Sequence, residues 1–259
     1  MTPIELKELK GKRPVVLISA YDAISARLAD AAGADILLVG DTVGIEVLGW
    51  GSIMPVTLDM MIHHVRAVSR GASQALIVAD MPFGSYGVRP DATVAHACRL
   101  VKEAGARAVK VAGGLEVLGD VRALCAIGIP VMGHIGIHSA QAWFGAAPEV
   151  VGGTREEEER LIEEAAQLEA AGCFALIAKC VSSRAIGQLS SRCRIPVISI
   201  GSGRADGVGA NFADLMGLAE KRSAWFSLRQ WEGGATMREE LARFVSAVQK
   251  GDLVPPARE

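Results

Sequence analysis

The chain lacks an excess of charge of either sign, because 27 Lys and Arg residues are nearly balanced by 29 Asp and Glu residues. Proteins that bind nucleic acid or anionic membranes usually carry a basic surplus. Also missing are a run of about 20 apolar residues, which a membrane-spanning helix needs, and the apolar N-terminal stretch of a signal peptide. The sequence therefore predicts a cytoplasmic protein that has neither nucleic acid nor a membrane as its partner.

The cysteines lack the CxxC spacing of metal and redox motifs, and there are 5 of them. An odd number in a chain long enough to bury its own core is typical of reduced intracellular thiols. No linker rich in Pro, Ser or Gly divides the chain. We therefore expect one domain spanning residues 1–259.

What the chain does contain is a series of apolar runs, each followed by one ionisable residue. Strands that are buried on both faces read as continuous Val, Ile and Leu runs, and polar groups begin where the strand leaves the core. The residues that follow five such runs are Asp41, Asp80, Lys110, His134 and Lys179. Each of them is a candidate for a functional site at the end of a strand.

Glycine separates the expected helices from the expected strands, as at Gly33, Gly105 and Gly172, in the position that commonly ends a helix. Strands are expected near residues 15, 35, 75, 108, 130, 174, 196 and 214. Repeated strand–helix units predict a parallel sheet. Eight units in a chain of 259 residues favour an α/β fold of the (β/α)8 TIM-barrel type over an open sheet.

In such a barrel the C-terminal ends of all strands lie on one face. We therefore expect the five ionisable residues to converge there, although any one of them taken alone would be better explained by a buried salt bridge or a satisfied core histidine. Elsewhere, four consecutive glutamates between Arg155 and Arg160 suit the start of a solvated helix better than a metal site. Residues 237–249 predict an amphipathic helix, and Trp225, Phe226 and Trp231 are expected to cover a barrel or subunit surface.

Several motifs together resemble the ketopantoate hydroxymethyltransferase family. They are Ser19–Asp22, Leu38–Gly44, Met54–Thr57, Ala79–Phe83, Val109–Val111 with Gly113 and Gly114, Gly133–Gly136 and Ile195–Gly201. The resemblance extends from Tyr21 to Gly251. It implies a (β/α)8 barrel of the phosphoenolpyruvate mutase and isocitrate lyase superfamily. It further implies an enzyme that deprotonates 2-oxoisovalerate, adds a hydroxymethyl group from methylenetetrahydrofolate, serves pantothenate biosynthesis and forms a homo-oligomer.

The resemblance also implies roles for individual residues. Asp41 and Asp80 would hold a Mg2+ ion that chelates the 2-oxo acid, and oxygen ligands suit this hard cation. Thr42 stands where the family has a serine that contacts the substrate. Lys110 would pair with the substrate carboxylate, and His134 would form a hydrogen bond near the same oxygens.

Two positions depart from the pattern of the family. Ala112 and Lys179 stand where the family has a glutamate beside the metal and a glutamate that removes the C3 proton. The site therefore loses two negative charges and gains a positive one, which opposes Mg2+ binding. The sequence of the loop 144–154 also differs from the family's motif at this place. This difference puts the identity of the one-carbon donor in doubt.

These departures leave several hypotheses open. The Lys179 ammonium could lie between Asp41 and Asp80 in place of the metal, or Lys179 could have a depressed pKa and act as base or Schiff-base nucleophile. The leading function is a hydroxymethyltransferase-like enzyme with Lys179 as a catalytic residue. The alternatives are a diverged aldolase or lyase that acts on another 2-oxo acid, and an inactive relative that serves as a binding or assembly subunit. The glycine-rich segment 201–207 suits an anion-binding loop and a structural turn equally well.

Overall fold

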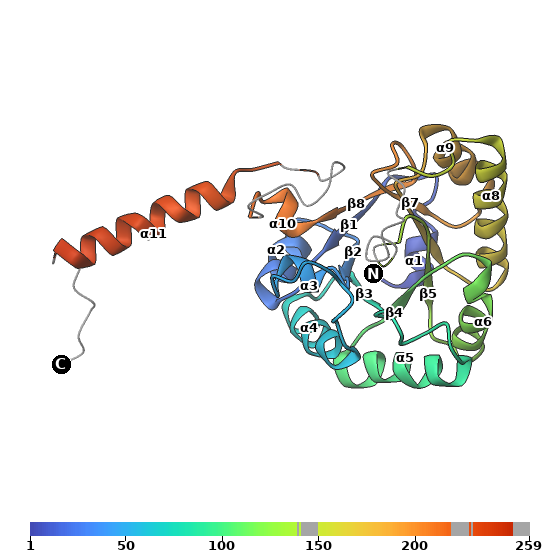
Figure 1. Ribbon diagram of the computed structural model, residues 1–259, viewed down its shortest axis with the longest axis horizontal. Coiled ribbons are helices and arrows are strands. Elements are labelled where there is room, and N and C mark those ends of the chain that lie inside the picture. Colours follow the sequence, from blue (N-terminus) through green and yellow to red (C-terminus); the bar gives the residue numbers. More distant parts are fainter. Residues whose placement is uncertain (139, 141–149, 219–227, 229, 251–259) are drawn as a thin grey trace. The chain divides into compact units, whose positions relative to one another are not determined.

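Eight parallel strands form a closed barrel in the computed structural model, in the order in which they occur along the chain (Figure 1). The strands are β1 (Val15–Ser19), β2 (Ile36–Val39), β3 (Leu76–Asp80), β4 (Ala108–Ala112), β5 (Val131–Gly136), β6 (Ala175–Lys179), β7 (Val197–Ile200) and β8 (Gly207–Asn211). The structure describes residues 1–259 except 139, 141–149, 219–227, 229 and 251–259. The predicted (β/α)8 barrel is confirmed.

Helices surround the strands, as Figure 1 shows for α2, α4, α5, α6, α8 and α9. Those in the first 210 residues are α1 (Pro3–Lys7), α2 (Ala23–Ala31), α3 (Val43–Glu46), α4 (Leu58–Gly71), α5 (Pro90–Ala104), the 3-10 helix η1 (Leu115–Val117), α6 (Leu118–Ala126), α8 (Arg155–Ala170) and α9 (Ser183–Arg192). Within the described ranges, every helix is too short or too polar to span a bilayer.

The chain divides into two compact units, Met1–Ala210 and Asn211–Glu259. The second unit contains the last residue of β8, the short helix α10 (Phe212–Leu215) and the helix α11 (Gly233–Lys250). Helix α11 contains the amphipathic helix predicted at 237–249, which is confirmed. Trp225 and Phe226 lie outside the described residues, whereas Trp231 is exposed. The assignment of residues 1–259 to one domain stays a prediction.

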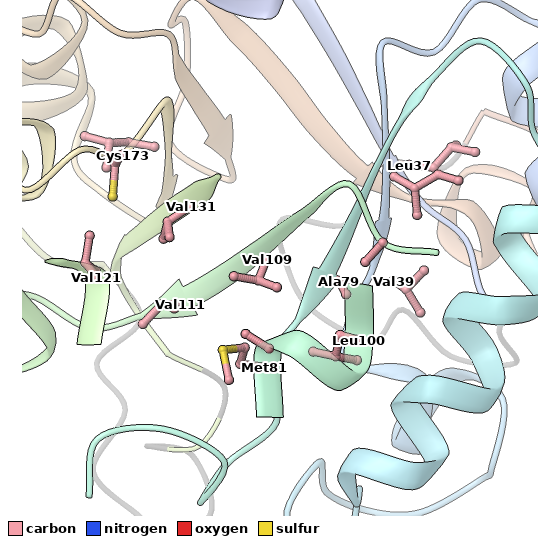
Figure 2. Packing of buried hydrophobic residues seen from close by; sticks show 14 of the residues in the cluster. Leu37, Val39, Ala79, Met81, Leu100, Val109, Val111, Val121, Val131 and Cys173 are labelled. Carbon is pink, nitrogen blue, oxygen red and sulfur yellow. The ribbon is translucent and has the colours of Figure 1, made fainter. Parts of the chain in front are cut away.

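Alternate strand residues face the barrel interior, because side chains along a strand point to opposite faces with a period of two. Leu6 of α1 joins the interior cluster. The interior cluster contains Val15, Leu17, Ile36, Leu38, Leu76, Val78, Ala108, Met132, Phe174, Ala175, Ile177 and Ile198. The intervening residues pack outward against the helices, and Figure 2 shows this layer with Leu37, Val39, Val109 and Val131.

One strand prediction was wrong, because the eighth strand is Gly207–Asn211 and the segment near 214 forms α10. The strand is short and rich in glycine, so it lacks the apolar run that marks the others. A Cβ atom at Gly207 would lie 2.5 Å from the carbonyl oxygen of Val15. Glycine is therefore needed where the last strand approaches the first one.

The glutamates near Arg155 open helix α8, as the sequence predicts. Thr154 is the N-cap, and its hydroxyl accepts a hydrogen bond from the backbone N–H of Glu157 at 3.2 Å. The carboxylate of Glu157 in turn accepts from the backbone N–H of Thr154 at 3.2 Å. This reciprocal capping box satisfies donors that the first helical turn leaves unpaired.

Candidate active site

The strand-end residues form the uppermost interior layer of the barrel. Asp80 is paired in register with Lys110, and Lys179 is paired with Gly136 and Ile200. The residues two positions before Asp80, Lys110 and Lys179 belong to the interior hydrophobic cluster, so the period of two directs these three side chains inward as well. The apolar interior thus gives way to charged groups at the C-terminal ends of the strands.

Lys110 connects the site through two contacts. Its Nζ atom lies 2.9 Å from Oδ1 of Asp80 and 3.2 Å from Nδ1 of His134. All three residues are buried. Because an ammonium group has only donors, Nδ1 of His134 accepts this hydrogen bond and the ring proton lies on Nε2. These two contacts use two of the three N–H groups of the Lys110 ammonium.

Burial lowers the pKa of His134 well below its ordinary value, and the positive charges of Lys110, His138 and Lys179 lower it further. The His134 ring therefore stays neutral near pH 7. The ring of His138 lies edge-to-face against it, with 5.1 Å between centroids. A neutral His134 can accept from Lys110 on one nitrogen and donate from the other.

Asp41 lies two residues after the end of β2, and its backbone N–H donates to Oδ2 of Asp80 at 3.3 Å. Burial and, next, the negative charge of Asp80 raise the pKa of Asp41 to about 7, against the opposing effect of Lys110 and Lys179. Two carboxyl groups held this close do not both ionise readily. Near neutral pH, Asp41 can therefore both give and take a proton.

Thr42 comes next in the chain and turns toward β1. Its Oγ1 atom lies 2.7 Å from the hydroxyl of Tyr21, and either group can be the donor. The backbone carbonyl of Tyr21 lies 2.7 Å from Nδ1 of His64. The Thr42 hydroxyl is thus held at the rim of the site by a residue of the loop after β1.

Lys179 ends β6 and is only partly buried. Burial lowers its pKa, and Lys110 lowers it further, whereas Cys180, Asp41 and Asp80 raise it by smaller amounts. Carboxylates alone would have kept this lysine protonated. The net effect is nevertheless a lowered pKa, because the Lys179 amine is desolvated and is affected by the positive charge of Lys110. These mutual effects place Lys179 within electrostatic reach of both Asp41 and Asp80.

Tyr86 also belongs to this site, although the sequence reasoning missed it. Its hydroxyl donates to the backbone carbonyl of Ala112 at 2.9 Å. Burial raises its pKa, and the charges of Asp80 and Asp41 raise it further, so the ring lies near both carboxylates. The signal available in the sequence was its position, six residues after Asp80 on the loop that follows β3.

The loop that carries Tyr86 is fixed from outside the site. The carbonyl of Ser85 lies 2.7 Å from Nδ1 of His96, and Asp120 accepts from the backbone N–H of Gly87 at 3.2 Å. Asp120 also accepts a hydrogen bond from the buried hydroxyl of Thr93. These contacts fix the loop from which the Tyr86 hydroxyl reaches the carbonyl of Ala112 at the end of β4.

The side chains at the rim do not fit a divalent cation. Both oxygens of Asp80 already accept hydrogen bonds, from Lys110 and from the backbone of Asp41. Ala112 supplies no carboxylate, and two lysines contribute positive charge. In the described part of the chain no three His, Cys, Asp or Glu side chains form a group suited to a metal. The donor set implied by the resemblance is therefore incomplete for Mg2+.

The glycine-rich segment 201–207 has a clear structural role. The hydroxyl of Ser202 accepts from the backbone N–H of Val181 at 2.8 Å and donates to the carbonyl of Ala178 at 2.9 Å. Asp206 pairs with Lys10 and accepts from the backbone N–H of Val197. These bonds tie β6, β7 and the N-terminal segment together, which supports the reading of a structural turn.

Comparison with known proteins adds an independent observation. The family described as "Ketopantoate hydroxymethyltransferase" matches residues 1–255. A protein of Nitratidesulfovibrio vulgaris (strain DP4) named 3-methyl-2-oxobutanoate hydroxymethyltransferase is 39% identical over 260 residues, covering 100% of this chain and 84% of the relative. A protein of the same name from Roseiflexus sp. (strain RS-1) is 41% identical over 249 residues, covering 96% and 89%.

Solved structures with the same fold are more distant. Phosphoenolpyruvate phosphomutase from Streptomyces platensis subsp. rosaceus superposes with a TM-score of 0.63 at 16% identity, covering 99% of this chain and 92% of that one. A phosphonopyruvate hydrolase in complex with oxalate and Mg2+ gives a TM-score of 0.62 at 12% identity, covering 97% and 88%. At these identities the likeness concerns the fold alone.

Proposed function

The chain belongs to the ketopantoate hydroxymethyltransferase family, and from this premise we propose that it is a transferase that adds a hydroxymethyl group to C3 of 3-methyl-2-oxobutanoate. The observation that supports this most directly is the Lys110 ammonium, held by Asp80 and His134 at the C-terminal end of the barrel. Two of its protons are committed to these neighbours. The third is available to a substrate carboxylate, and such a charge-assisted hydrogen bond is strong.

The other rim residues complete the proposed site. The Thr42 hydroxyl, which forms a hydrogen bond with Tyr21, is proposed to contact the 2-oxo acid. Asp41, whose pKa is raised to about 7 by burial and Asp80, is suited to take up the C3 proton near neutral pH. Lys179 supplies positive charge close to the reacting carbonyl, where negative charge develops as the enolate forms.

Methylenetetrahydrofolate is the proposed one-carbon donor, because of the family to which the chain belongs. Its binding region would include the loop 144–154, most of which lies outside the described residues. The donor assignment is tested by following ketopantoate formation from 3-methyl-2-oxobutanoate with and without methylenetetrahydrofolate. A protein that forms product only with another one-carbon compound would contradict it.

Mg2+ is the metal that the resemblance implies at Asp41 and Asp80, but the incomplete donor set argues for weak binding. The proposed reaction therefore proceeds without a metal. The chemistry that a metal would supply, stabilisation of the enolate oxygen, is assigned to the lysine side chains. Enolisation that survives excess EDTA is the expected result.

Exchange of the C3 proton of 3-methyl-2-oxobutanoate for deuterium, followed by NMR, tests the proposed function without requiring the donor. Exchange catalysed by the protein is expected, and Lys110→Met should abolish it. An absence of exchange with this substrate would overturn the assignment. Exchange of other 2-oxo acids instead would favour a diverged aldolase or lyase, a candidate that Ala112 and Lys179 keep open. Binding without exchange of any 2-oxo acid would favour an inactive binding subunit.

We also propose that the chain forms a homo-oligomer and works in the cytoplasm. Ile24 and Leu28, one turn apart on helix α2, are 70% and 56% exposed. On the neighbouring strand β1, Val16 is 42% exposed. Exposed apolar side chains of this kind are suited to burial against another copy of the chain.

A further inference from the structure

We propose that Lys179 forms a Schiff base with the C2 carbonyl of the 2-oxo acid, so that an iminium on the protein itself takes the place of a metal ion in stabilising the enolate. The proposal rests on the proposed function, because it requires a 2-oxo acid to be enolised at this site. It follows from the mismatch between the rim residues and a divalent cation. It also follows from the way in which the fold presents Lys179.

The backbone that carries Lys179 is fixed on both sides. Its carbonyl accepts from the backbone N–H of Ile137 at 2.9 Å, and the N–H of Cys180 donates to the carbonyl of Ile200 at 2.8 Å. The strand β5 approaches so closely that a Cβ atom at Gly136, which has φ +92°, would lie 2.3 Å from the Lys179 carbonyl oxygen. The Cα atom of Lys179 is therefore held firmly at the rim, as a nucleophile requires.

The residue after Lys179 has an unusual conformation. Cys180 has φ 52°, and it is the one non-glycine residue in the described part of the chain with positive φ. Its carbonyl accepts from the backbone N–H of Val151 at 2.9 Å, which holds the conformation in place. Such a conformation costs on the order of 1 kcal/mol or more and is often found at functional sites. Here it turns the chain sharply at the point where Lys179 leaves the barrel.

Lys110 and Lys179 have different roles in this proposal. Lys110 is immobilised by Asp80 and His134 and is suited to hold the substrate carboxylate. The carbonyl carbon at C2 is bonded directly to that carboxylate, so it lies one bond farther into the site. Lys179 is the second amine at this rim, because Lys110 on β4 and Lys179 on β6 each lie two residues after an interior residue of the same closed barrel. A second amine beside a carboxylate-binding amine is the arrangement that imine formation with a 2-oxo acid needs.

The surroundings favour the reactive amine form of Lys179. Burial and the positive charge of Lys110 lower its pKa. Desolvation and a neighbouring cation are the two effects that activate Schiff-base lysines in general. This electrostatic effect supports a proposal that the geometry and the absent metal ligands already suggest.

The steps balance in atoms and electrons. The Lys179 ammonium first transfers one proton to a neighbouring carboxylate, and the Nζ lone pair then attacks C2. The carbonyl oxygen leaves as water with that proton and one proton from Nζ, which gives a protonated C=N bond. Loss of the C3 proton to a carboxylate yields a neutral enamine. One water converts methylenetetrahydrofolate into tetrahydrofolate and formaldehyde. C3 of the enamine attacks the formaldehyde carbon, whose oxygen takes the proton held by the carboxylic acid and becomes the new hydroxyl group. A second water hydrolyses the iminium, which restores the C2 carbonyl and releases the product and the Lys179 ammonium.

Reduction with sodium borohydride tests the proposal directly, because hydride converts an iminium into a stable secondary amine. The full-length protein is incubated with 3-methyl-2-oxobutanoate in excess EDTA, reduced, and measured by intact-mass spectrometry and peptide mapping. We expect one adduct per chain, located on Lys179. Lys179→Arg retains a positive charge but cannot form an imine, and it should lose the adduct. The exposed lysine variant Lys102→Arg is the matched control and should keep it.

Deuterium exchange at C3, measured on the same samples, separates failure of this inference from failure of the proposed function. An adduct on Lys179 together with metal-independent exchange supports both. Exchange without an adduct on Lys179, or exchange that Lys179→Arg retains in full, overturns the Schiff base and leaves the function standing. An adduct without exchange would show that Lys179 forms an imine, but it would overturn both the role of that imine in enolisation and the proposed function. Neither adduct nor exchange overturns both.

Discussion

The Nζ atom of Lys110 lies 2.9 Å from Oδ1 of Asp80, and this ion pair is buried between adjacent strands of the barrel. The register of β3 and β4 places the two residues side by side. Both charges have been removed from water, so each depends on the other. The pair is therefore expected to govern stability as well as substrate binding.

Lys110→Met should lower the free energy of unfolding by about 3 kcal/mol, because it leaves Asp80 as an uncompensated buried charge. Asp80→Asn combined with Lys110→Met removes both charges and should recover most of this loss. Urea denaturation of the two single variants and the double variant measures the coupling. Lys102→Met on the exposed end of α5 is the control. Additive losses in the double variant would show that the two residues are not coupled.

Asp41→Asn should change how stability depends on pH. Burial and Asp80 raise the pKa of Asp41 to about 7, above its ordinary value of 3.8, so the folded state binds the proton more tightly. The contribution of this bound proton to the stability of the folded state is complete below about pH 4 and is lost as the pH rises through about 7. At pH 8 the variant should be more stable than the unmodified protein by on the order of 1 kcal/mol. Denaturation between pH 5 and 8 checks this, and a difference independent of pH would contradict it.

Ala112→Glu combined with Lys179→Glu should increase the affinity for Mg2+ at least tenfold, which is about 1.4 kcal/mol. The change adds two carboxylates and removes one ammonium group beside Asp41 and Asp80, so both the ligand set and the charge become suited to a divalent cation. Isothermal titration with MgCl2 measures the gain. Ala112→Gln with Lys179→Gln, which has similar size without the negative charge, should gain much less. Equal gains in the two double variants would show that charge is not the cause.

Asp30→Ala should destabilise the barrel by about 3 kcal/mol, because three backbone N–H groups at the start of β3 lose their acceptor. The carboxylate accepts from Ser73, Gln74 and Ala75 at 2.9, 3.1 and 2.7 Å. Burial acts to raise the pKa of Asp30, but these hydrogen bonds outweigh it and the pKa is lowered. The stabilisation is therefore present above the ordinary value of 3.8 and lost as the pH falls through the lowered pKa.

Urea unfolding at pH 7 and pH 3 distinguishes this role from simple packing. The difference in the free energy of unfolding between Asp30→Ala and the unmodified protein should be smaller at pH 3 than at pH 7. Asp30→Asn keeps one oxygen acceptor and should lie between them at pH 7. A gap that is equally wide at both values would indicate that the loss comes from packing.

Ile24→Lys with Leu28→Lys should reduce the mass of the assembly in solution, because the apolar surface on α2 is proposed to be covered by another copy of the chain. Both side chains are exposed in the single chain, so the fold should tolerate the change. Light scattering measures the mass, and circular dichroism checks the helix content. Leu115→Lys, an exposed apolar residue in η1 on another part of the barrel, is the control. An unchanged mass would place any subunit interface elsewhere.

The sequence by itself determined the barrel and the positions from which its site is built. Continuous apolar runs indicated seven of the eight strands. Glycines that end helices indicated where one strand–helix unit stops and the next strand begins. Because parallel strands end on one face, the order of the runs is sufficient to assign the residues that follow them to the same rim. The eighth strand could not be located in this way, since its glycines carry no apolar pattern and are needed for close approach to the neighbouring strands β1 and β7.

Tertiary structure alone decided which rim residues interact. The pairing of Lys110 with both Asp80 and His134 depends on the register of β3, β4 and β5, which no local pattern specifies. Burial and the charge of Lys110 lower the pKa of Lys179. The nearby carboxylates alone would have suggested a raised pKa. Tyr86 joined the site because its loop folds back over the end of β4. Distances between residues far apart in the chain are set by barrel closure, and local sequence does not encode them.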